Sequence, residues 1–415
     1  DTYHYSGEFV VDSGSSANII RIAGGDTAFS GDDDRIQFTG FVDLDQNTLV
    51  INSLGGEVCF QNAVNNGALS ISTVSGDIVM SDVVGGEVPL SSLSLLANDI
   101  SVSNWGTILG GGIEGDVALI SNDDNDDLAS IVFSGVSYTV GGNALIGAHN
   151  SSQPIEFQNG SNAIAFTALS TDNENKIEIN GSLELNSSDV VFDVAAGELI
   201  FDGTVNGSAH IDIIADTVEV QFNAPVGDRV ALDLLSVQSS KELDLNDVIA
   251  NKIQVNSELI NLIGTGYQAI ADDLYLGGPV KLLSTEAVVS LDASDSGQNI
   301  TITGSINDSE LGHSELSLSA GNSNIDLQGP IGDQIYLGDF IIHSANQTDV
   351  NSVAAKSISL ASNTINLNGV SYAAQMGEIS LVGAVEMSAQ QQQVLISTSA
   401  VLPCKISVTG PINDT

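Results

Sequence analysis

One segment of this chain occurs twice, and the duplication constrains the fold more than any other feature. "INLIGTGYQAIADDLYLGGPV" (260–280) aligns without a gap with "INLNGVSYAAQMGEISLVGAV" (365–385), 105 positions later. The alignment places Tyr267 on Tyr372 and keeps a glycine three residues before each tyrosine. Internal repetition on this scale indicates a repeat architecture, in which each unit packs on the next.

The repetition extends beyond this segment. The same offset relates residues 225–232 to 330–337. A third copy is traceable from Leu69, where "LSISTVSGDIVMSDVVGGEVPL" runs without a gap against "LSLSAGNSNIDLQGPIGDQIYL" (316–337), and "SGVSYTV" (134–140) then matches "NGVSYAA". We therefore expect three copies of a super-repeat of roughly 105 to 120 residues.

The repeat boundaries are placed at glycines that begin equivalent motifs. The expected segments are an N-terminal β-rich segment or first coils (1–61), super-repeat 1 (62–180), super-repeat 2 (181–303), super-repeat 3 (304–409) and the start of a fourth, incomplete copy (410–415).

Within the copies, short stretches alternate apolar and polar residues with a period of two. Examples are "KIEIN" (176–180), "TVEVQF" (217–222), "ELSLS" (315–319) and "EISLV" (378–382). Each stretch places apolar side chains on one face and small polar or acidic ones on the other, which is the pattern of a half-buried strand. Gly, Asn, Asp and Ser separate the stretches, as tight turns require. The sequence predicts an all-β protein.

Glycine-led motifs recur within the last copy, at Gly304, Gly329, Gly369, Gly383 and Gly410. Their spacing suggests irregular coils of roughly 20 residues, which is in the range of solenoid repeats. One such coil cannot bury its apolar face alone. Stacked coils can, because each strand pairs in parallel with its equivalent one turn away. The pattern therefore favours a parallel β-helix, or β-solenoid.

Tandem immunoglobulin-like β-sandwiches are the alternative architecture, because a module of about 105 residues suits them. Such modules normally bury one Trp each, whereas Trp105 is the only Trp of the whole chain. The copies also differ in length, and no Pro- or Gly-rich linkers separate them. These observations favour the solenoid.

The strings "ITGSIND", "ELSLSAGNSNIDLQGPIGD" (315–333) and "INLNGVSYAAQMGEISLVGAV" carry a family resemblance. They are similar to the β-strand repeats of large bacterial surface and secreted proteins related to filamentous haemagglutinin and autotransporter passenger domains. The resemblance covers about residues 36–415, and its motifs encode coil geometry. It implies a right-handed parallel β-helix, export to the cell surface, and a role in adhesion or matrix building.

The chain carries 53 acidic residues against 9 Lys and Arg, a formal charge of −44. A field of this sign repels phosphate groups, so we expect no nucleic-acid partner and no attraction to anionic membranes. The sequence contains no apolar run of 18 residues, so we expect no helical insertion of this segment into a membrane. One interpretation of the acidity is a solvated exterior that keeps a long β-rich surface soluble.

Calcium binding is the second interpretation of the acidity, because carboxylate and amide oxygens are the ligands that Ca²⁺ prefers. Two clusters supply them, "GDDDR" (31–35) and "NDDNDD" (122–127), although neither follows the helix-loop-helix calcium pattern. Calcium is thus a candidate and no cofactor is established. The candidate ligands are Asp32, Asp33, Asp34, Asp123, Asp124, Asp126 and Asp127.

Residues that could support catalysis are scattered. No "GxSxG" turn accompanies the histidines, and each is interpreted as a surface or turn residue; they are His4, His149, His210, His313 and His343. Carboxylate pairs suitable for glycoside hydrolysis arise by chance in so acidic a chain, as in "ADD" (271–273). Holding an anionic polysaccharide would need clustered cations, which the sequence lacks. We therefore predict that the protein is not an enzyme, with a polysaccharide hydrolase or lyase as the remaining alternative.

Cys59 and Cys404 are the two cysteines, too few for a disulfide framework and too distant in sequence for a local metal site. Both are expected to be buried thiols, with a bridge between protomers as the alternative. Tyr138, Tyr267 and Tyr372 occupy equivalent places in the three copies and are expected to close a corner or cover a coil edge, with stacking on a ligand as the alternative.

These observations predict an extracellular structural protein of a bacterial surface: a stalk, filament or adhesin segment that provides length, stiffness and the display of contact loops. The expected partners are other copies of the chain or the rest of a longer surface protein, with carbohydrate or a host or abiotic surface as further candidates. The start at Asp1 and the end in mid-repeat at Thr415 suggest a processed or excised piece. A calcium-stabilised carbohydrate-binding or surface-layer component is the alternative function.

Overall fold

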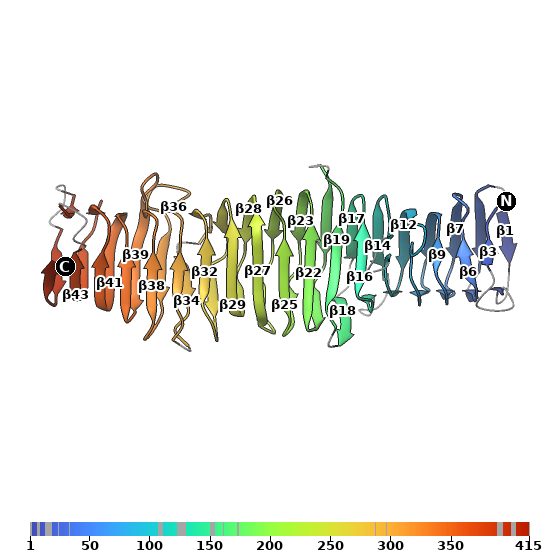
Figure 1. Ribbon diagram of the computed structural model, residues 1–415, viewed down its shortest axis with the longest axis horizontal. Helices are drawn as coiled ribbons and strands as arrows, with labels where there is room; N and C mark the ends of the chain where they lie inside the picture. Colours follow the sequence, from blue (N-terminus) through green and yellow to red (C-terminus); the bar gives the residue numbers. More distant parts are fainter. Residues whose placement is uncertain are drawn as a thin grey trace. The chain divides into compact units, whose positions relative to one another are not determined.

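A computed structural model of the chain describes residues 2–5, 9–12, 19–23, 25–32, 34–106, 111–122, 130–149, 154–160, 162–171, 174–286, 288–295, 297–387, 393–399 and 404–414. The chain divides into two units, unit 1 (Asp1–Gln221) and unit 2 (Phe222–Thr415). In both units, the described secondary structure consists of short strands that stack lap upon lap (Figure 1).

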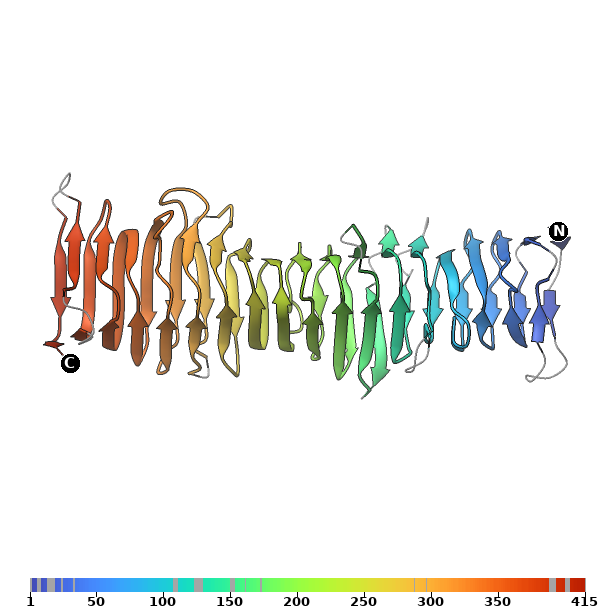
Figure 2. The same ribbon diagram turned by 45° about the horizontal axis from the view of Figure 1, so that its top comes forward.

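Each lap of unit 1 contributes strands to three faces, and strands of one face lie side by side in successive laps (Figure 2). The first face comprises β1 (Thr2–Tyr5), β4 (Thr27–Gly31), β7 (Thr48–Ser53), β10 (Gly67–Thr73), β12 (Leu90–Ala97), β14 (Val117–Asn122), β17 (Ala144–His149), β20 (Lys176–Asn180), β23 (Gly197–Phe201) and β26 (Val218–Phe222).

The other two faces of unit 1 follow the same order of laps. The second face comprises β2 (Phe9–Val11), β5 (Ile36–Phe38), β8 (Val58–Phe60), β11 (Ile78–Met80), β13 (Ile100–Val102), β15 (Ile131–Phe133), β18 (Ile155–Gly160), β21 (Leu183–Ser187) and β24 (Val205–Asn206). The third face comprises one sheet of β3 (Ile19–Arg21), β6 (Phe41–Asp43) and β9 (Val64–Asn65) and part of another, with β16 (Ser137–Val140), β19 (Ile164–Ala168), β22 (Asp189–Val194) and β25 (His210–Ile214). Isolated bridges at Val84 and Trp105 connect β9 to β16.

Unit 2 has the same kind of lap pattern, with some strands long enough to run around a corner. Its strands are β27 (Leu232–Ser240), β28 (Glu242–Leu245), β29 (Val248–Ser257), β30 (Ile260–Leu262), β31 (Gly266–Ala269), β32 (Leu274–Gly277), β33 (Val280–Leu282), β34 (Val288–Asp292), β35 (Ile300–Ile302), β36 (Ile306–Asp308), β37 (Glu315–Ser319), β38 (Asn324–Leu327), β39 (Leu337–Ser344), β40 (Gln347–Val350), β41 (Val353–Leu367), β42 (Ser371–Ala374), β43 (Ile379–Met387), β44 (Leu395–Thr398), β45 (Ile406–Thr409) and β46 (Ile412–Asp414).

Strands of neighbouring laps pair in parallel, as when β10 pairs with β7 on one side and β12 on the other. Residues that meet across a lap boundary are commonly 22 positions apart, as for Arg35 and Glu57. The predicted β-solenoid is therefore confirmed. The alternative of immunoglobulin-like sandwiches is wrong, because these need antiparallel sheets.

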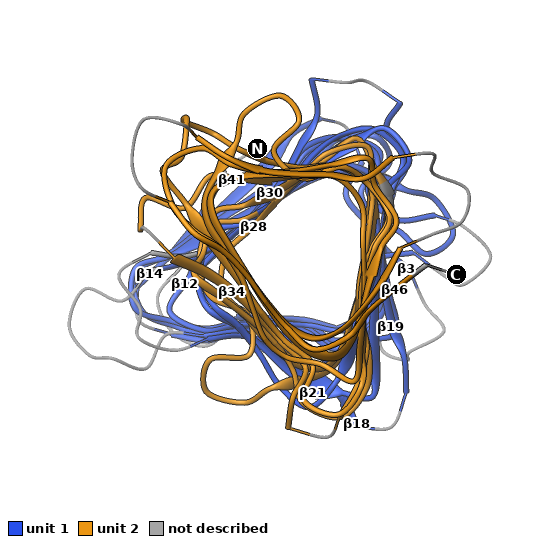
Figure 3. Cartoon of the chain, turned by 90° about the vertical axis from the view of Figure 1, so that its left-hand side faces the viewer, with its two compact units in different colours: residues 1–221 blue, residues 222–415 orange. Residues whose placement is uncertain are grey.

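The alternation in the sequence explains which side chains face inward. In β10, "GALSIST", buried and half-buried residues alternate, and Leu69 and Ile71 point into the unit. Register then aligns equivalent residues of successive laps, so that Leu49, Leu69 and Leu93 form one buried column. Each unit has a three-sided outline in cross-section (Figure 3). The buried columns lie inside it. Burying apolar surface in continuous columns stabilises every lap through its neighbours.

The interior of unit 1 also contains stacked aromatic rings. Phe38 and Phe60 stack with centroids 4.4 Å apart, and Phe133 and Phe157 with centroids 4.8 Å apart. Trp105, fully buried, packs edge-on against Tyr138 in the next lap, 5.3 Å away. Although aromatic residues make up only 5% of the chain, rings are concentrated in the core of unit 1.

Candidate functional site

A turn closed by a buried tyrosine recurs along the chain, and we call each occurrence a tyrosine turn. In the second copy, the Tyr267 hydroxyl accepts the Gly264 N–H at 3.0 Å and donates to the Leu245 carbonyl of the preceding lap at 2.6 Å. Asp247 Oδ1 accepts the Thr265 N–H at 2.5 Å and the Thr265 hydroxyl at 3.2 Å. The turn is thereby fastened to the lap before it at two points.

The third copy repeats this geometry. The Tyr372 hydroxyl accepts the Gly369 N–H at 2.9 Å and donates to the Val350 carbonyl at 2.9 Å. Here Ser352 replaces the aspartate, and its hydroxyl accepts the Val370 N–H at 3.0 Å. The expectation that the equivalent tyrosines close a corner is confirmed for this pair of turns.

The first copy, in unit 1, has the same arrangement. The Tyr138 hydroxyl accepts the Gly135 N–H at 2.6 Å and donates to the Val102 carbonyl at 3.4 Å. Asn104 Oδ1 accepts the Val136 N–H at 2.7 Å. Aspartate, serine and asparagine therefore serve as the turn-capping residue in the three copies, because each offers an oxygen acceptor at the same place.

All three tyrosine hydroxyls are neutral donors. Burial raises the pKa of Tyr138, Tyr267 and Tyr372 above the ordinary tyrosine value, and the glycine N–H bonds lower it by less. The proton that each hydroxyl donates to a carbonyl is therefore retained well above neutral pH.

A depression of about 400 Å³ opens on the outer surface of unit 2 beside the Tyr267 turn. It spans four successive laps, whose inward residues Val226, Val248, Tyr267 and Leu291 pair in sequence. Its lining combines apolar surface with hydroxyl, amide and carboxylate groups.

Gly266 creates much of this space. A Cβ built on Gly266 would meet its nearest neighbour, Asp247 Oδ1, only at 3.9 Å, so a side chain is simply missing there. Ser137 and Ser371 occupy the equivalent positions in the first and third copies. The hollow therefore follows from one glycine in a shared framework.

Two side chains at the rim of the depression are held in place by neighbours. Gln268 Nε2 donates to Asp295 Oδ2 at 2.9 Å, and Asp292 Oδ1 accepts the Ser294 N–H at 2.9 Å. Gln268 and Asp292 sit side by side in adjacent strands, β31 and β34. The rim thus presents an oriented amide next to an oriented carboxylate.

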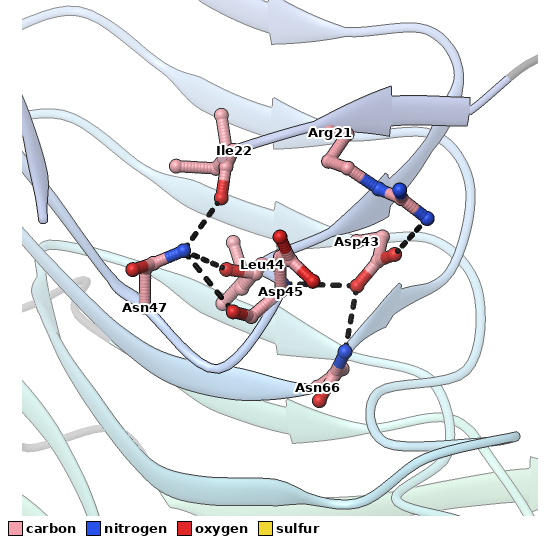
Figure 4. A network of polar contacts seen from close by, with 7 residues as sticks. All are labelled: Arg21, Ile22, Asp43, Leu44, Asp45, Asn47 and Asn66. Atoms are coloured by element: carbon pink, nitrogen blue, oxygen red, sulfur yellow. Dashed lines mark hydrogen bonds and ion pairs between the residues drawn. The ribbon is translucent and has the colours of Figure 1, made fainter. Parts of the chain in front are cut away.

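A second polar cluster lies at a turn of unit 1 (Figure 4). Asp43 forms an ion pair with Arg21 at 3.2 Å and accepts hydrogen bonds from Asn66 Nδ2 and the Asp45 N–H, both at 2.9 Å. Burial by itself raises the pKa of the Asp43 carboxyl, but these hydrogen bonds and the Arg21 charge outweigh it, so the pKa is lowered. In the same turn, Asn47 Nδ2 donates to three backbone carbonyls.

A column of charged residues follows one corner of unit 1, where Arg35, Glu57, Asp77 and Asp99 immediately precede paired strands of successive laps. Arg35 Nε and Glu57 Oε1 are 2.7 Å apart. Burial raises the pKa of the Asp77 carboxyl, and the charges of Asp99 and Glu57 raise it further. The surroundings therefore raise the pKa of Asp77 and lower the pKa of Asp43.

Only two of the seven predicted calcium ligands lie in the described part of the chain. Asp32 and Asp34 are described, whereas Asp33 lies outside the described residues. The second cluster, Asp123, Asp124, Asp126 and Asp127, also lies outside them. Among the described residues, no group of three or more His, Cys, Asp or Glu side chains is arranged to hold a metal ion.

The two cysteines are both free thiols, Cys59 in unit 1 and Cys404 in unit 2. Cys59 is buried, as predicted, and burial raises the pKa of its thiol. The expectation of a buried thiol is wrong for Cys404, which is partly exposed because it lies just before β45, in the last described lap.

The described histidine side chains lie at the surface. His313 and His343 are exposed, and His210 Nδ1 lies 3.0 Å from Asp189 Oδ1, with both side chains half-exposed. The side chains of His4 and His149 are outside the described set.

Sequence reasoning missed the capping residues and the depression. The capping residues have a signal: Asp247 and Ser352 lie 105 positions apart, as do the asparagines before them, Asn246 and Asn351. Both asparagines donate to the backbone of the preceding lap, at 2.9 and 2.7 Å. The depression has a weaker signal, a glycine where the other two copies have serine.

Comparisons of the chain with protein-family models, with curated proteins and with solved structures found no match. In the part of the chain that the structure describes, no helix is long and apolar enough to cross a membrane.

Proposed function

We propose that this chain is an extracellular structural protein, a stalk, filament or adhesin segment of a bacterial surface that supplies length, stiffness and display. One observation carries the proposal: strands of each lap pair in parallel with equivalent strands of the laps on both sides. Every lap is then a template for the next, and a unit can be lengthened without a new core.

Side chains on the outside reinforce these lap-to-lap contacts. In unit 2, Asp273 Oδ1 accepts the Asn299 N–H at 2.9 Å, and Asn299 Oδ1 accepts the Asn324 N–H at 3.1 Å. Asn346 Nδ2 donates to Asn324 at 3.3 Å, and Asn363 Nδ2 to Asn346 at 3.4 Å. This asparagine ladder ties five consecutive laps at one corner, which supports a load-bearing role.

An uncharged part of one sheet face supports the display role. On the first face of unit 1, two outward columns contain only uncharged residues across β4, β7, β10, β12, β14 and β17. We call these columns the uncharged face; its residues are Ala28, Ser30, Val50, Asn52, Ser70, Ser72, Ser94, Leu96, Ala118, Ile120, Leu145 and Gly147. In a chain of charge −44, it is a place where another copy can approach without bringing carboxylates together.

Single-molecule stretching of the chain tests the mechanical part of the proposal. Pulling from the two ends should remove laps one after another, giving many small rupture events whose spacing follows the lengths of the laps. A single large event, or unfolding at negligible force, would contradict a load-bearing role.

Self-association through the uncharged face is tested by Ser70→Glu combined with Ser94→Glu. Light scattering should show association of the unchanged protein at high salt, where the carboxylates elsewhere are screened. The double variant should stay monomeric. The control variant Ser91→Glu, at an exposed residue outside the uncharged face, should associate like the unchanged protein. Equal association of all three proteins would reject this face as the contact.

Surface localisation belongs to the same proposal. Protease treatment of intact cells should remove the chain while cytoplasmic markers survive. We also propose that the protein is not an enzyme, and a shortening of neutral or anionic polysaccharides by the purified protein would contradict this. A hydrolase or lyase would then replace the structural interpretation.

Calcium stabilisation is the second candidate function, as part of a carbohydrate-binding or surface-layer component. The acidic stretches 31–35 and 122–127 favour it, because their carboxylate and amide oxygens are the ligands that Ca²⁺ prefers. Thermal melting at millimolar Ca²⁺, with Mg²⁺ as the control, should raise Tm by several degrees if this function holds. An unchanged Tm would reject it.

A further inference from the structure

We propose that the depression beside the Tyr267 turn binds a short, neutral, hydroxyl-rich saccharide segment. The inference does not rest on the mechanical role, because a stalk with or without this site would resist stretching equally. Its test below measures binding alone, so its failure and the failure of the structural proposal are distinguishable.

The lining of the depression suits a sugar ring, which has both an apolar face and polar edges. Ile249 and Pro225 provide apolar surface, while Ser290, Gln268 and Asp292 provide a hydroxyl, an amide and a carboxylate. Ligand sites typically combine apolar walls with a few placed polar groups in this way. Sugar hydroxyls can donate to the carboxylate and amide oxygens and accept from the Ser290 hydroxyl.

Electrostatics decides against an anionic ligand. Asp228, Asp247 and Asp292 all line the depression, and the lining contains no Lys or Arg. The chain as a whole carries a charge of −44. An uronate, sialate or phosphate group would meet like charge from the site and from the surrounding surface, which costs several kcal/mol at close juxtaposition. Uncharged saccharides carry no such penalty.

The site is held rigid before any ligand arrives. Its floor is the backbone of the Tyr267 turn, which Asp247 fastens through the Thr265 N–H at 2.5 Å and the Gly266 N–H at 2.7 Å. The Gln268 amide is oriented by Asp295. A preformed site loses little conformational entropy on binding, so even a shallow depression can hold a flexible sugar chain.

Length also fits a chain rather than a single ring. The depression runs across four laps, and neighbouring strands are separated by about 4.8 Å. A segment of two to three sugar rings that runs across the laps would place each ring over a different lap.

The third copy provides a natural comparison. There Ser371 replaces Gly266 and adds a side chain, and Ala373 replaces Gln268 and removes the amide. The fold of the turn is nevertheless the same, with Tyr372 bonded to Gly369 and Val350. Gly266→Ser therefore installs a residue that the same turn already accommodates elsewhere.

Isothermal titration of the full chain with neutral trisaccharides of gluco, galacto and manno configuration tests the proposal, with trigalacturonate as the anionic control. At least one neutral trisaccharide should bind with a Kd in the micromolar to millimolar range, and trigalacturonate at least tenfold more weakly. Gly266→Ser and Gln268→Ala should each weaken the neutral ligand at least tenfold. Ser371→Gly, the matched change in the third copy, should leave the affinity unchanged.

Circular dichroism and Tm must match the unchanged protein for Gly266→Ser, so that lost binding reports the site. Absence of binding by all the neutral trisaccharides would overturn the proposal, as would binding that survives Gly266→Ser. Spermidine supplies the remaining comparison: if it displaces the saccharide at equal concentration and loses affinity with salt, the depression is a cation site and the proposal fails.

Discussion

The Tyr267 and Tyr372 turns share one skeleton and differ at the surface. In both, a tyrosine hydroxyl links a glycine N–H to a carbonyl of the preceding lap. Outside, the second copy has Gly266 and Gln268 where the third has Ser371 and Ala373. The difference teaches that coil geometry fixes the buried hydrogen bonds, whereas outward positions are free to acquire individual surfaces.

The largest expected effect comes from the glycine of each turn. A Cβ on Gly264 would lie 2.3 Å from Asp247 N, and one on Gly369 would lie 2.1 Å from Ser352 N. Both contacts are with backbone, so Gly264→Ala and Gly369→Ala should each lower the free energy of unfolding by about 3 kcal/mol. Urea unfolding measures this.

Gly266→Ala is the matched control for these changes. Its Cβ would meet Asp247 Oδ1 at 3.9 Å, an ordinary contact, so the free energy of unfolding should change by less than about 0.5 kcal/mol. Equal effects of Gly264→Ala and Gly266→Ala would show that close backbone approach does not shape the turn.

Removing the tyrosine hydroxyl should have the next largest effect. Tyr267→Phe removes the hydroxyl that bridges the Gly264 N–H and the Leu245 carbonyl. The carbonyl still accepts the Ile263 N–H at 3.0 Å, and the Gly264 N–H keeps a 3.4 Å contact with it, so we expect a cost of about 1 kcal/mol. Tyr372→Phe should cost a similar amount, because its two hydrogen bonds are equivalent. Thermal unfolding of both variants sharpens the comparison: a difference above about 1 kcal/mol would mean that the skeletons are not the same.

Alkaline pH should act on both turns in the same direction. Burial raises the pKa of Tyr267 and Tyr372 in the folded protein. The stabilisation linked to these neutral hydroxyls is therefore complete at pH values below the ordinary tyrosine pKa. That contribution is lost as pH rises above the unfolded value of about 10, by about 1.4 kcal/mol per tyrosine for each pH unit until the folded pKa is reached. Stability measured between pH 9 and 11 should fall, and the fall should be shallower in Tyr267→Phe. An equal slope in both proteins would contradict the buried, neutral hydroxyl.

The smallest effect expected is a difference between the two capping residues. Asp247 accepts three hydrogen bonds from Thr265 and Gly266, whereas Ser352 accepts bonds at 3.0 and 3.4 Å. Hydrogen bonds to a charged acceptor are the stronger class, so Asp247→Ala should cost about 1 kcal/mol more than Ser352→Ala. Thermal melting of the two variants checks the order, and a larger loss for Ser352→Ala would reverse it.

Much of the fold was predictable because the strands and turns of each lap require a characteristic pattern of apolar, polar and glycine residues in the local sequence. Alternation in "ELSLS" and "KIEIN" correctly predicted β37 and β20, since period two is set by the strand itself. The offset of 105 predicted that Tyr267 and Tyr372 would occupy equivalent places. The stacked rings of unit 1 were not anticipated, because overall composition averages over the chain and hides local concentrations.

The candidate site was much less predictable. Gln268 and Asp292 are 24 residues apart in the chain and become neighbours only when β31 and β34 pair. Lap lengths vary, so the sequence does not fix which outward residues meet. The predicted calcium ligands drew on local clusters of charge, and the described part of the chain provides no grouping that holds a metal.

By itself, the sequence determined that this chain forms stacked parallel coils with aliphatic columns inside, because periodicity and internal repetition are local properties that survive without knowledge of the fold. Only the tertiary structure decided which side chains of different laps touch: the capping of each tyrosine turn, the asparagine ladder, and the hollow at Gly266. These contacts depend on the register between segments about 20 residues apart in the sequence. The register is fixed only when the laps stack, because all the buried columns must align at the same time.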